Sequence, residues 1–171
     1  MISQNLIQFE TIFNSLLSLQ ILEENRFNTD EKLEAFLEDV CLNLQNSYPK
    51  RATHYRRTID KLKEDYGKYH DIYCFFDSLT LGQAVTLYTG LPEPQRRALL
   101  GEMSNYGIAF GATNPEDLRN LLFRIVNIRN CIDHGNSLEV LIHFYNRHDG
   151  SLRKPSDRKR YLSLIARLLN K

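Results

Sequence analysis

The sequence contains few cysteines, and their spacing is typical neither of a disulfide framework nor of a zinc site. Among 171 residues there are three, Cys41, Cys74 and Cys131, which lie far apart. An odd number of widely separated cysteines argues against a disulfide framework, and no second Cys/His pair matches Cys131 and His134 to complete a zinc site. Each cysteine falls in a segment of helical periodicity. We therefore expect three reduced thiols in the core, with no metal and no cofactor.

Long apolar runs and strand patterns are also missing. No run approaches the length that crosses a membrane, and residues 1–10 lack the basic start and apolar stretch of a signal peptide. These absences predict a cytoplasmic protein with no membrane partner. There is no alternating apolar and polar pattern, no internal repeat and no low-complexity tract, so the sequence favours an all-α fold over any sheet.

Charge is nearly balanced overall but unevenly distributed. Residues 1–50 hold three basic and eight acidic residues, a net of about −5, whereas residues 147–171 hold eight basic and two acidic ones, about +6. The basic segment is a candidate surface for phosphate groups, unless the two ends neutralise each other within the fold or across a dimer. The candidate RNA-binding residues are Arg147, Arg153, Lys154, Arg158, Lys159 and Arg160.

Apolar residues recur at helical spacing through most of the chain. Asn28 with Glu31 suggests a capping box at the start of the second helix, and Tyr48-Pro49 marks its end. The third stretch repeats aromatic residues that suit core packing better than base stacking, and Gly67 on its flank either bends the helix or permits close packing. We expect one domain over residues 1–171, a bundle of about four long helices with short additions. The predicted helices cover residues 2–24, 28–48, 53–76, 81–89, 94–106, 114–135, about 138–145, and a last one from 155 with Leu162, Ile165, Leu168 and Leu169 facing inward.

The stretch from Asn114 to Asn136 has polar residues that its helix does not need. Asn114 is a suitable N-cap and Gly135 a suitable stop. Leu118, Leu121, Leu122, Ile125 and Ile132 form an apolar stripe, and helical spacing places Arg129 within it. Such an arginine is costly without a partner. Asn130 and His134, four residues apart, share a different face.

The order Arg129, Asn130, then His134 resembles the arginine-to-histidine signature of the HEPN superfamily of all-helical ribonucleases. Upstream, Leu79-Thr80-Leu81-Gly82-Gln83 followed by Leu87-Tyr88 is similar to a segment of the abortive-infection (Abi-like) branch of that superfamily. The resemblance implies a HEPN-like bundle and a toxin or defence effector that cuts RNA. It also implies a 2′,3′-cyclic phosphate product, and restraint by an RNA or protein antitoxin.

The residue types suit this chemistry. The RNA 2′-hydroxyl is the nucleophile, so cleavage needs proton transfer and positive charge near the phosphate, and no metal. In this reading Arg129 binds the phosphate, His134 is the general acid or base, and Asn130 orients the histidine or the substrate. Arg129 and His134 point about 140° apart on a regular helix. A homodimer that brings two such helices together would unite them, as in HEPN families.

Asp133 departs from the Abi-like pattern and leaves the role of Arg129 open. It lies four residues from Arg129, so a salt bridge between them is expected. That pair either orients the arginine as a supporting contact or occupies it and leaves the domain inactive. Two other functions therefore stay open: a catalytically silent HEPN module that binds RNA or a partner protein, and a purely structural helical dimer.

Overall fold

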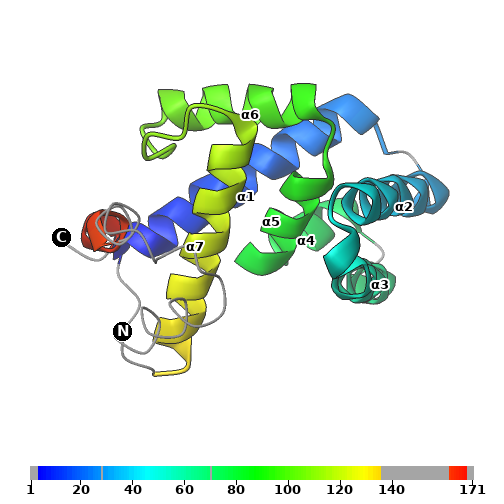
Figure 1. Cartoon of the computed structure of the whole chain (residues 1–171). Helices are drawn as coiled ribbons and strands as arrows, with labels where there is room; N and C mark the ends of the chain where they lie inside the picture. Colours follow the sequence, from blue (N-terminus) through cyan, green and yellow to red (C-terminus); the bar gives the residue numbers. More distant parts are fainter. Residues whose placement is uncertain (1–3, 28, 70, 136–161, 169–171) are drawn as a thin grey trace. The chain divides into compact units, whose positions relative to one another are not determined.

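The computed structural model describes residues 4–27, 29–69, 71–135 and 162–168, and every regular element in these ranges is helical (Figure 1). The all-α prediction is confirmed. None of the helices in these ranges is both long and apolar enough to cross a membrane. The elements are α1 (Gln4–Asn25), α2 (Asp30–Ser47), the 3-10 helix η1 (Pro49–Arg51), α3 (Ala52–Tyr69), α4 (Ile72–Asp77), α5 (Leu81–Gly90), α6 (Glu93–Asn105) and α7 (Pro115–Asp133); residues 162–168 are also helical.

The chain forms two compact units. One comprises residues 1–11 and 120–171, and the other comprises Ile12–Arg119. The first turns of α7 belong to the larger unit and the remainder to the smaller one, and α1 is likewise shared. A single HEPN-like domain over residues 1–171 stays a prediction.

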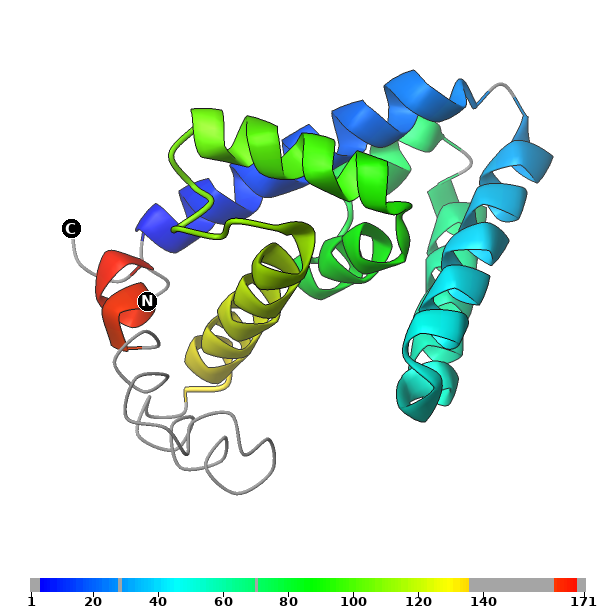
Figure 2. The same cartoon turned by 45° about the horizontal axis from the view of Figure 1, so that its top comes forward.

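In the larger unit, α2 and α3 form an antiparallel helical hairpin (Figure 2). The turn between them occurs where the sequence predicts it: α2 ends at Ser47, and Pro49 opens η1. Proline there restricts the preceding residue, Tyr48, to non-helical conformations. The facing residues of the two helices are almost completely buried, among them Leu37, Leu44 and Ile59. The hairpin is therefore held by an apolar seam.

The segment predicted as one helix over residues 53–76 is two helices. α3 ends at Tyr69 and α4 begins at Ile72, after Asp71, whose side chain accepts a hydrogen bond from the Cys74 amide at 2.7 Å. This local N-cap ends the first helix and starts the second. Tyr69 and Tyr73 are 49% and 67% exposed, whereas Phe76 is buried, so the predicted aromatic stripe is interrupted at this break. Gly67 lies within α3, where an added Cβ would meet nothing within 4 Å, and it marks no boundary.

Two smaller predictions are wrong in the same unit. Cys74 is exposed, whereas Cys41 and Cys131 are buried as expected. The N-cap of α2 is Thr29, without a side-chain capping hydrogen bond, and α2 begins at Asp30. Asn28, the predicted capping residue, lies outside the described residues.

The described part of the smaller unit buries apolar side chains from three segments. Leu6 and Phe9 come from α1, and Leu122, Ile125 and Ile128 from α7. In the helical segment 162–168 the prediction is partly wrong. One residue that was expected to face inward is exposed, and a residue that was not expected to face inward is buried. The exposed residue is Leu162, the buried ones are Leu164, Ile165 and Leu168, and Leu169 lies outside the described residues.

Candidate active site

Helix α7 carries the arginine-to-histidine motif, and local hydrogen bonds fix both of its ends. The Asn114 side chain accepts hydrogen bonds from the amides of Glu116 and Asp117 at 3.1 and 2.9 Å, which confirms the predicted N-cap. At the other end the His134 amide donates to the Asn130 carbonyl at 3.1 Å, and Gly135 adopts a positive φ of 65°. A left-handed glycine stops the helix here. His134 is therefore the first residue after α7.

The buried stripe of α7 is rotated relative to the sequence prediction. Leu118, Leu122 and Ile125 are fully buried as expected, but Ile128 continues the stripe with no exposed surface. Cys131, 7% exposed, follows it, and burial raises the pKa of its thiol, which stays protonated at neutral pH. Leu121 and Ile132 are only half-buried. Arg129 therefore lies at the margin of the apolar stripe, where its side chain keeps 30% of its surface exposed.

Two carboxylates hold the Arg129 guanidinium. Its Nε donates to Glu10 Oε2 of α1 at 3.3 Å, and its Nη1 forms an ion pair with Asp133. The Asp133 salt bridge was predicted from the four-residue spacing. Glu10 was not predicted, because it lies 119 residues away in sequence and nothing in its local pattern marks it. The partly buried arginine is thus compensated and oriented, and the three side chains carry a formal net charge of −1.

The other two motif residues lie at the surface. Asn130 and His134 are both exposed. Their hydrogen bond joins backbone atoms only, so an orienting role for the Asn130 side chain stays a prediction. An exposed imidazole is accessible to solvent and therefore to a substrate. The candidate site accordingly combines an oriented cation on one side of the helix with an accessible acid–base group at its end.

The second segment of the resemblance has a clear structural role in the larger unit. Thr80 and Gln83 form a capping box at the start of α5, with the Thr80 amide donating to Gln83 Oε1 at 2.9 Å. Tyr88 is fully buried, and its hydroxyl donates to the Pro115 carbonyl at 3.0 Å. This bond joins α5 to the first turn of the motif helix. Burial raises the pKa of the Tyr88 hydroxyl, so it remains a donor at neutral pH.

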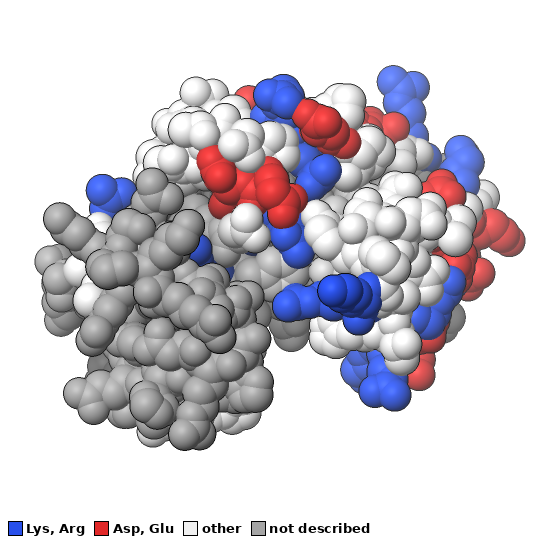
Figure 3. Space-filling view, viewed as in Figure 1, with Lys and Arg blue, Asp and Glu red and all other residues white. Residues whose placement is uncertain are grey.

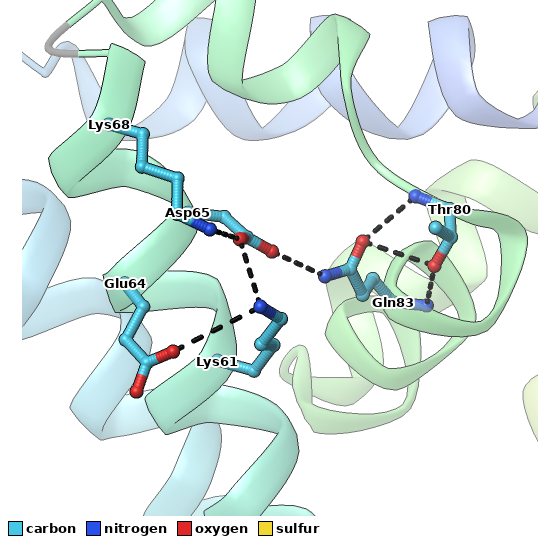
Figure 4. A network of polar contacts seen from close by, with 6 residues as sticks. All are labelled: Lys61, Glu64, Asp65, Lys68, Thr80 and Gln83. Carbon is cyan, nitrogen blue, oxygen red and sulfur yellow. Dashed lines mark hydrogen bonds and ion pairs between the residues drawn. The ribbon is translucent and has the colours of Figure 1, made fainter.

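A polar network links the capping box to α3 (Figure 4). The Gln83 amide donates to Asp65 at 3.2 Å, and Asp65 also accepts from Lys68 at 3.0 Å and pairs with Lys61 at 3.4 Å. The hydrogen bonds from Lys68 and Gln83, together with the charge of Lys61, hold the pKa of Asp65 below its usual value against the effect of burial. The network is a structural contact between α3 and α5 rather than a reaction centre.

None of the six predicted RNA-binding residues is among the residues that the structure describes. Arg147, Arg153, Lys154, Arg158, Lys159 and Arg160 lie outside the described residues. Among the residues that are described, no group of three or more His, Cys, Asp or Glu side chains is arranged to hold a metal ion. The candidate site on the described chain thus consists of Arg129, Asn130 and His134, with Asp133 and Glu10 in support.

Comparison with known proteins does not assign the chain to a family. No protein-family model, curated protein or solved structure matches it.

Proposed function

We propose that the protein is a metal-independent endoribonuclease of the HEPN type, which cleaves RNA by intramolecular attack of the 2′-hydroxyl. The observation that carries the proposal is the arrangement at the end of α7. Arg129 is oriented by Glu10 and Asp133, and His134 is exposed directly after the helix. A positioned guanidinium and an accessible imidazole are the groups that this reaction needs.

In the proposed mechanism, the Arg129 guanidinium binds non-bridging oxygens of the scissile phosphate and offsets charge that develops as the 2′-oxygen attacks. The His134 imidazole performs one of the two proton transfers, either removing the 2′-hydroxyl proton or protonating the departing 5′-oxygen, and water performs the other. The P–O5′ bond breaks as the P–O2′ bond forms, which leaves a 2′,3′-cyclic phosphate and a 5′-hydroxyl. In a homodimer the His134 of one copy can lie beside the Arg129 of the other, so each composite site holds one arginine and one histidine.

The biological role follows from the sequence resemblance alone. We propose a toxin or abortive-infection defence effector that acts in the cytoplasm on cellular or phage RNA. An RNA or protein antitoxin would restrain it. The resemblance of residues 79–88 to the Abi-like branch and of residues 129–134 to the HEPN signature supports this role.

The ion pairs of Arg129 also favour a second function. A guanidinium that already binds Glu10 and Asp133 has fewer donors for a phosphate, and the formal charge of the three groups opposes an anion. This contact favours a catalytically silent HEPN module that binds RNA or a partner protein. The two functions differ in the role of His134: the ribonuclease needs it for cleavage, whereas the silent module binds its partner without it.

The deciding experiment is RNA cleavage in EDTA by the parent protein and by His134→Ala and Arg129→Ala. Arg124→Ala is the matched control, because it removes an arginine from the same helix outside the motif. The proposal expects cleavage by the parent and the control, a cyclic phosphate product, and activity reduced by about 100-fold or more without His134. Equal cleavage by all four proteins would identify a contaminant. If the four proteins bind RNA and none of them cleaves it, the silent module is established.

A further inference from the structure

The turn between α2 and α3 concentrates positive charge. Residues 40–59 contain Lys50, Arg51, Arg56 and Arg57 and no aspartate or glutamate, a net of +4 over twenty residues. Lys50 and Arg51 lie in η1, and Arg57 lies on the second turn of α3. In Figure 3, basic side chains stand out where Figure 1 places η1 and α3. This concentration lies in the larger unit, apart in sequence from the basic C-terminal segment.

Further along α3, basic side chains are neutralised by carboxylates. Lys61 and Lys68 both pair with Asp65, and Lys63 pairs with Glu38. This is the usual arrangement on a solvated helix, where opposite charges alternate at short spacing. The second half of α3 therefore presents little free positive charge.

The start of the hairpin differs. Arg56 binds Glu38 at 2.9 Å, but Lys50 and Arg57 are exposed and form no ion pair with the residues that the structure describes. Arg51 is exposed as well. The charges of Lys50 and Arg57 are thus not compensated by a carboxylate of the described residues, which favours the binding of an anion here.

Additional guanidinium groups lie beside Tyr48, the residue just before η1. Arg119 Cζ lies 4.1 Å from the centre of the Tyr48 ring. Burial and the nearby carboxylate of Glu116, which accepts a hydrogen bond from the Tyr48 hydroxyl, raise the pKa of that hydroxyl, whereas the charges of Arg119 and Arg96 lower it. Arg96 Nε is buried and has no hydrogen-bond partner among the described residues. Arg119 is paired with Glu116, so it adds no net positive charge to the turn.

The same region offers little for a folded protein to pack against. Of the large apolar side chains found exposed in the described chain, none lies between residues 43 and 68. The buried centre of a protein interface is enriched in apolar and aromatic groups and depleted of charge. A surface of lysine and arginine without such a centre suits a polyanion better.

We propose that Lys50, Arg51 and Arg57, here called the basic turn, bind the phosphate backbone of RNA. The choice of RNA over another polyanion rests on the proposed ribonuclease function. Guanidinium groups bind phosphate oxygens through two parallel hydrogen bonds, and lysine adds a mobile point charge. Contacts of this kind carry no base specificity, so the basic turn contributes affinity and positions the strand, and any sequence preference arises elsewhere.

The test measures binding of a labelled single-stranded RNA of about 20 nucleotides, longer than typical single-strand site sizes. The full-length His134→Ala protein is used so that the RNA stays intact. Into it we introduce K50Q/R51Q/R57Q or, as the matched control, K61Q/K63Q/K68Q. Both triple variants remove three positive charges from the hairpin, but only the first removes the basic turn. Thermal unfolding verifies that both are folded.

The expected result is an affinity loss of about tenfold or more for the basic-turn variant and a much smaller loss for the control. The slope of log affinity against log salt should become less steep by about 0.7 for each phosphate contact removed. RNA should also protect Lys50 from acetylation, which tests the site in a protein without substitutions in the turn.

Other outcomes overturn the proposal. Equal losses in the two variants would show a dependence on net charge alone. Unchanged binding by the basic-turn variant, with loss on replacing Arg153 and Lys154, would move the RNA site to the C-terminal segment. A labelled polyglutamate that binds the turn more tightly than RNA would indicate an acidic protein partner. If the parent protein fails to cleave RNA but binding still depends on the turn, the nuclease function fails and the RNA surface stands.

Discussion

At the residue scale, the central feature is the pair of carboxylates that hold Arg129. Glu10 and Arg129 keep only 20% and 30% of their side-chain surface exposed, so their attraction is screened less than that of a fully solvated pair. We predict that Glu10→Gln lowers the free energy of unfolding by about 1 kcal/mol. A double-mutant cycle with Arg129→Gln should give a coupling of roughly 0.5–1 kcal/mol.

The matched control for this cycle is the Glu93–Arg97 pair of α6, in which both side chains are at least 60% exposed. Its coupling should be about 0.3 kcal/mol, as for other exposed pairs four residues apart. Urea unfolding of the two sets of variants measures both values. Equal couplings would mean that Glu10 is an ordinary surface partner and does not orient Arg129.

A second residue-scale prediction concerns acid sensitivity. Hydrogen bonds from Lys63 and, to a smaller extent, from Arg56 hold the pKa of Glu38 below its ordinary value of 4.5. A carboxylate whose folded pKa is depressed contributes stability above its unfolded pKa and loses it as the pH falls through the folded value. We therefore expect Glu38→Gln to flatten the decline in unfolding free energy below about pH 4.5.

The comparison for Glu38 is Glu102→Gln on α6, an exposed carboxylate with no ion pair to any residue the structure describes. It should leave the shape of the pH profile unchanged. Since the Glu38 side chain is 40% exposed, high salt should also reduce the difference between the parent and Glu38→Gln. Identical profiles for Glu38→Gln and the parent would show that this network does not contribute to acid stability.

At the scale of elements, the close approach of α5 to α2 depends on a glycine. A Cβ added to Gly90 would lie 2.5 Å from Val40 Cγ1 and 2.8 Å from the Val40 carbonyl oxygen. The Asn43 amide also donates to the Gly90 carbonyl at 3.0 Å, which ties the two helices together at this point. We predict that Gly90→Ala destabilises the protein by about 1–3 kcal/mol, because the backbone of α2 cannot move away without losing packing.

Gly101→Ala on α6 is the matched control, since an added Cβ there meets nothing within 4 Å. Removing a glycine from an open position in a helix reduces the entropy of the unfolded chain, so this variant should be stabilised by roughly 0.5–1 kcal/mol. Thermal or urea unfolding distinguishes the opposite signs. A neutral Gly90→Ala would mean that α2 and α5 are less closely packed than the structure indicates.

The elements also show what periodicity predicts and what it leaves out. Apolar spacing and capping residues located most helices to within a few residues, because those signals are local. The break between α3 and α4 was missed, since the Asp71 cap competes with an aromatic repeat that continues through it. Glu10 was missed for a different reason. Its role depends on a contact with Arg129 that only the folded chain creates.

At the scale of the whole molecule, the proposed reaction requires two copies of the chain. A spacing of five residues on a regular helix corresponds to about 140°, so a single motif is expected to be poorly placed to present Arg129 and His134 to one phosphate. In a two-fold dimer, each composite site receives an arginine from one copy and a histidine from the other. The Arg129→Ala homodimer then lacks both arginines, and the His134→Ala homodimer lacks both histidines. Each should be inactive.

Mixing the two inactive variants should restore cleavage. Random exchange of subunits yields about half mixed dimers, and each of these retains one Arg129 and one His134 on different copies. The expected activity is a substantial fraction of the parent value, measured after subunit exchange has been verified by mass spectrometry of tagged chains. Recovery requires the two residues to act across the interface, because neither variant has both on the same chain. Verified mixed dimers without cleavage would restrict catalysis to one copy of α7 and contradict the composite site.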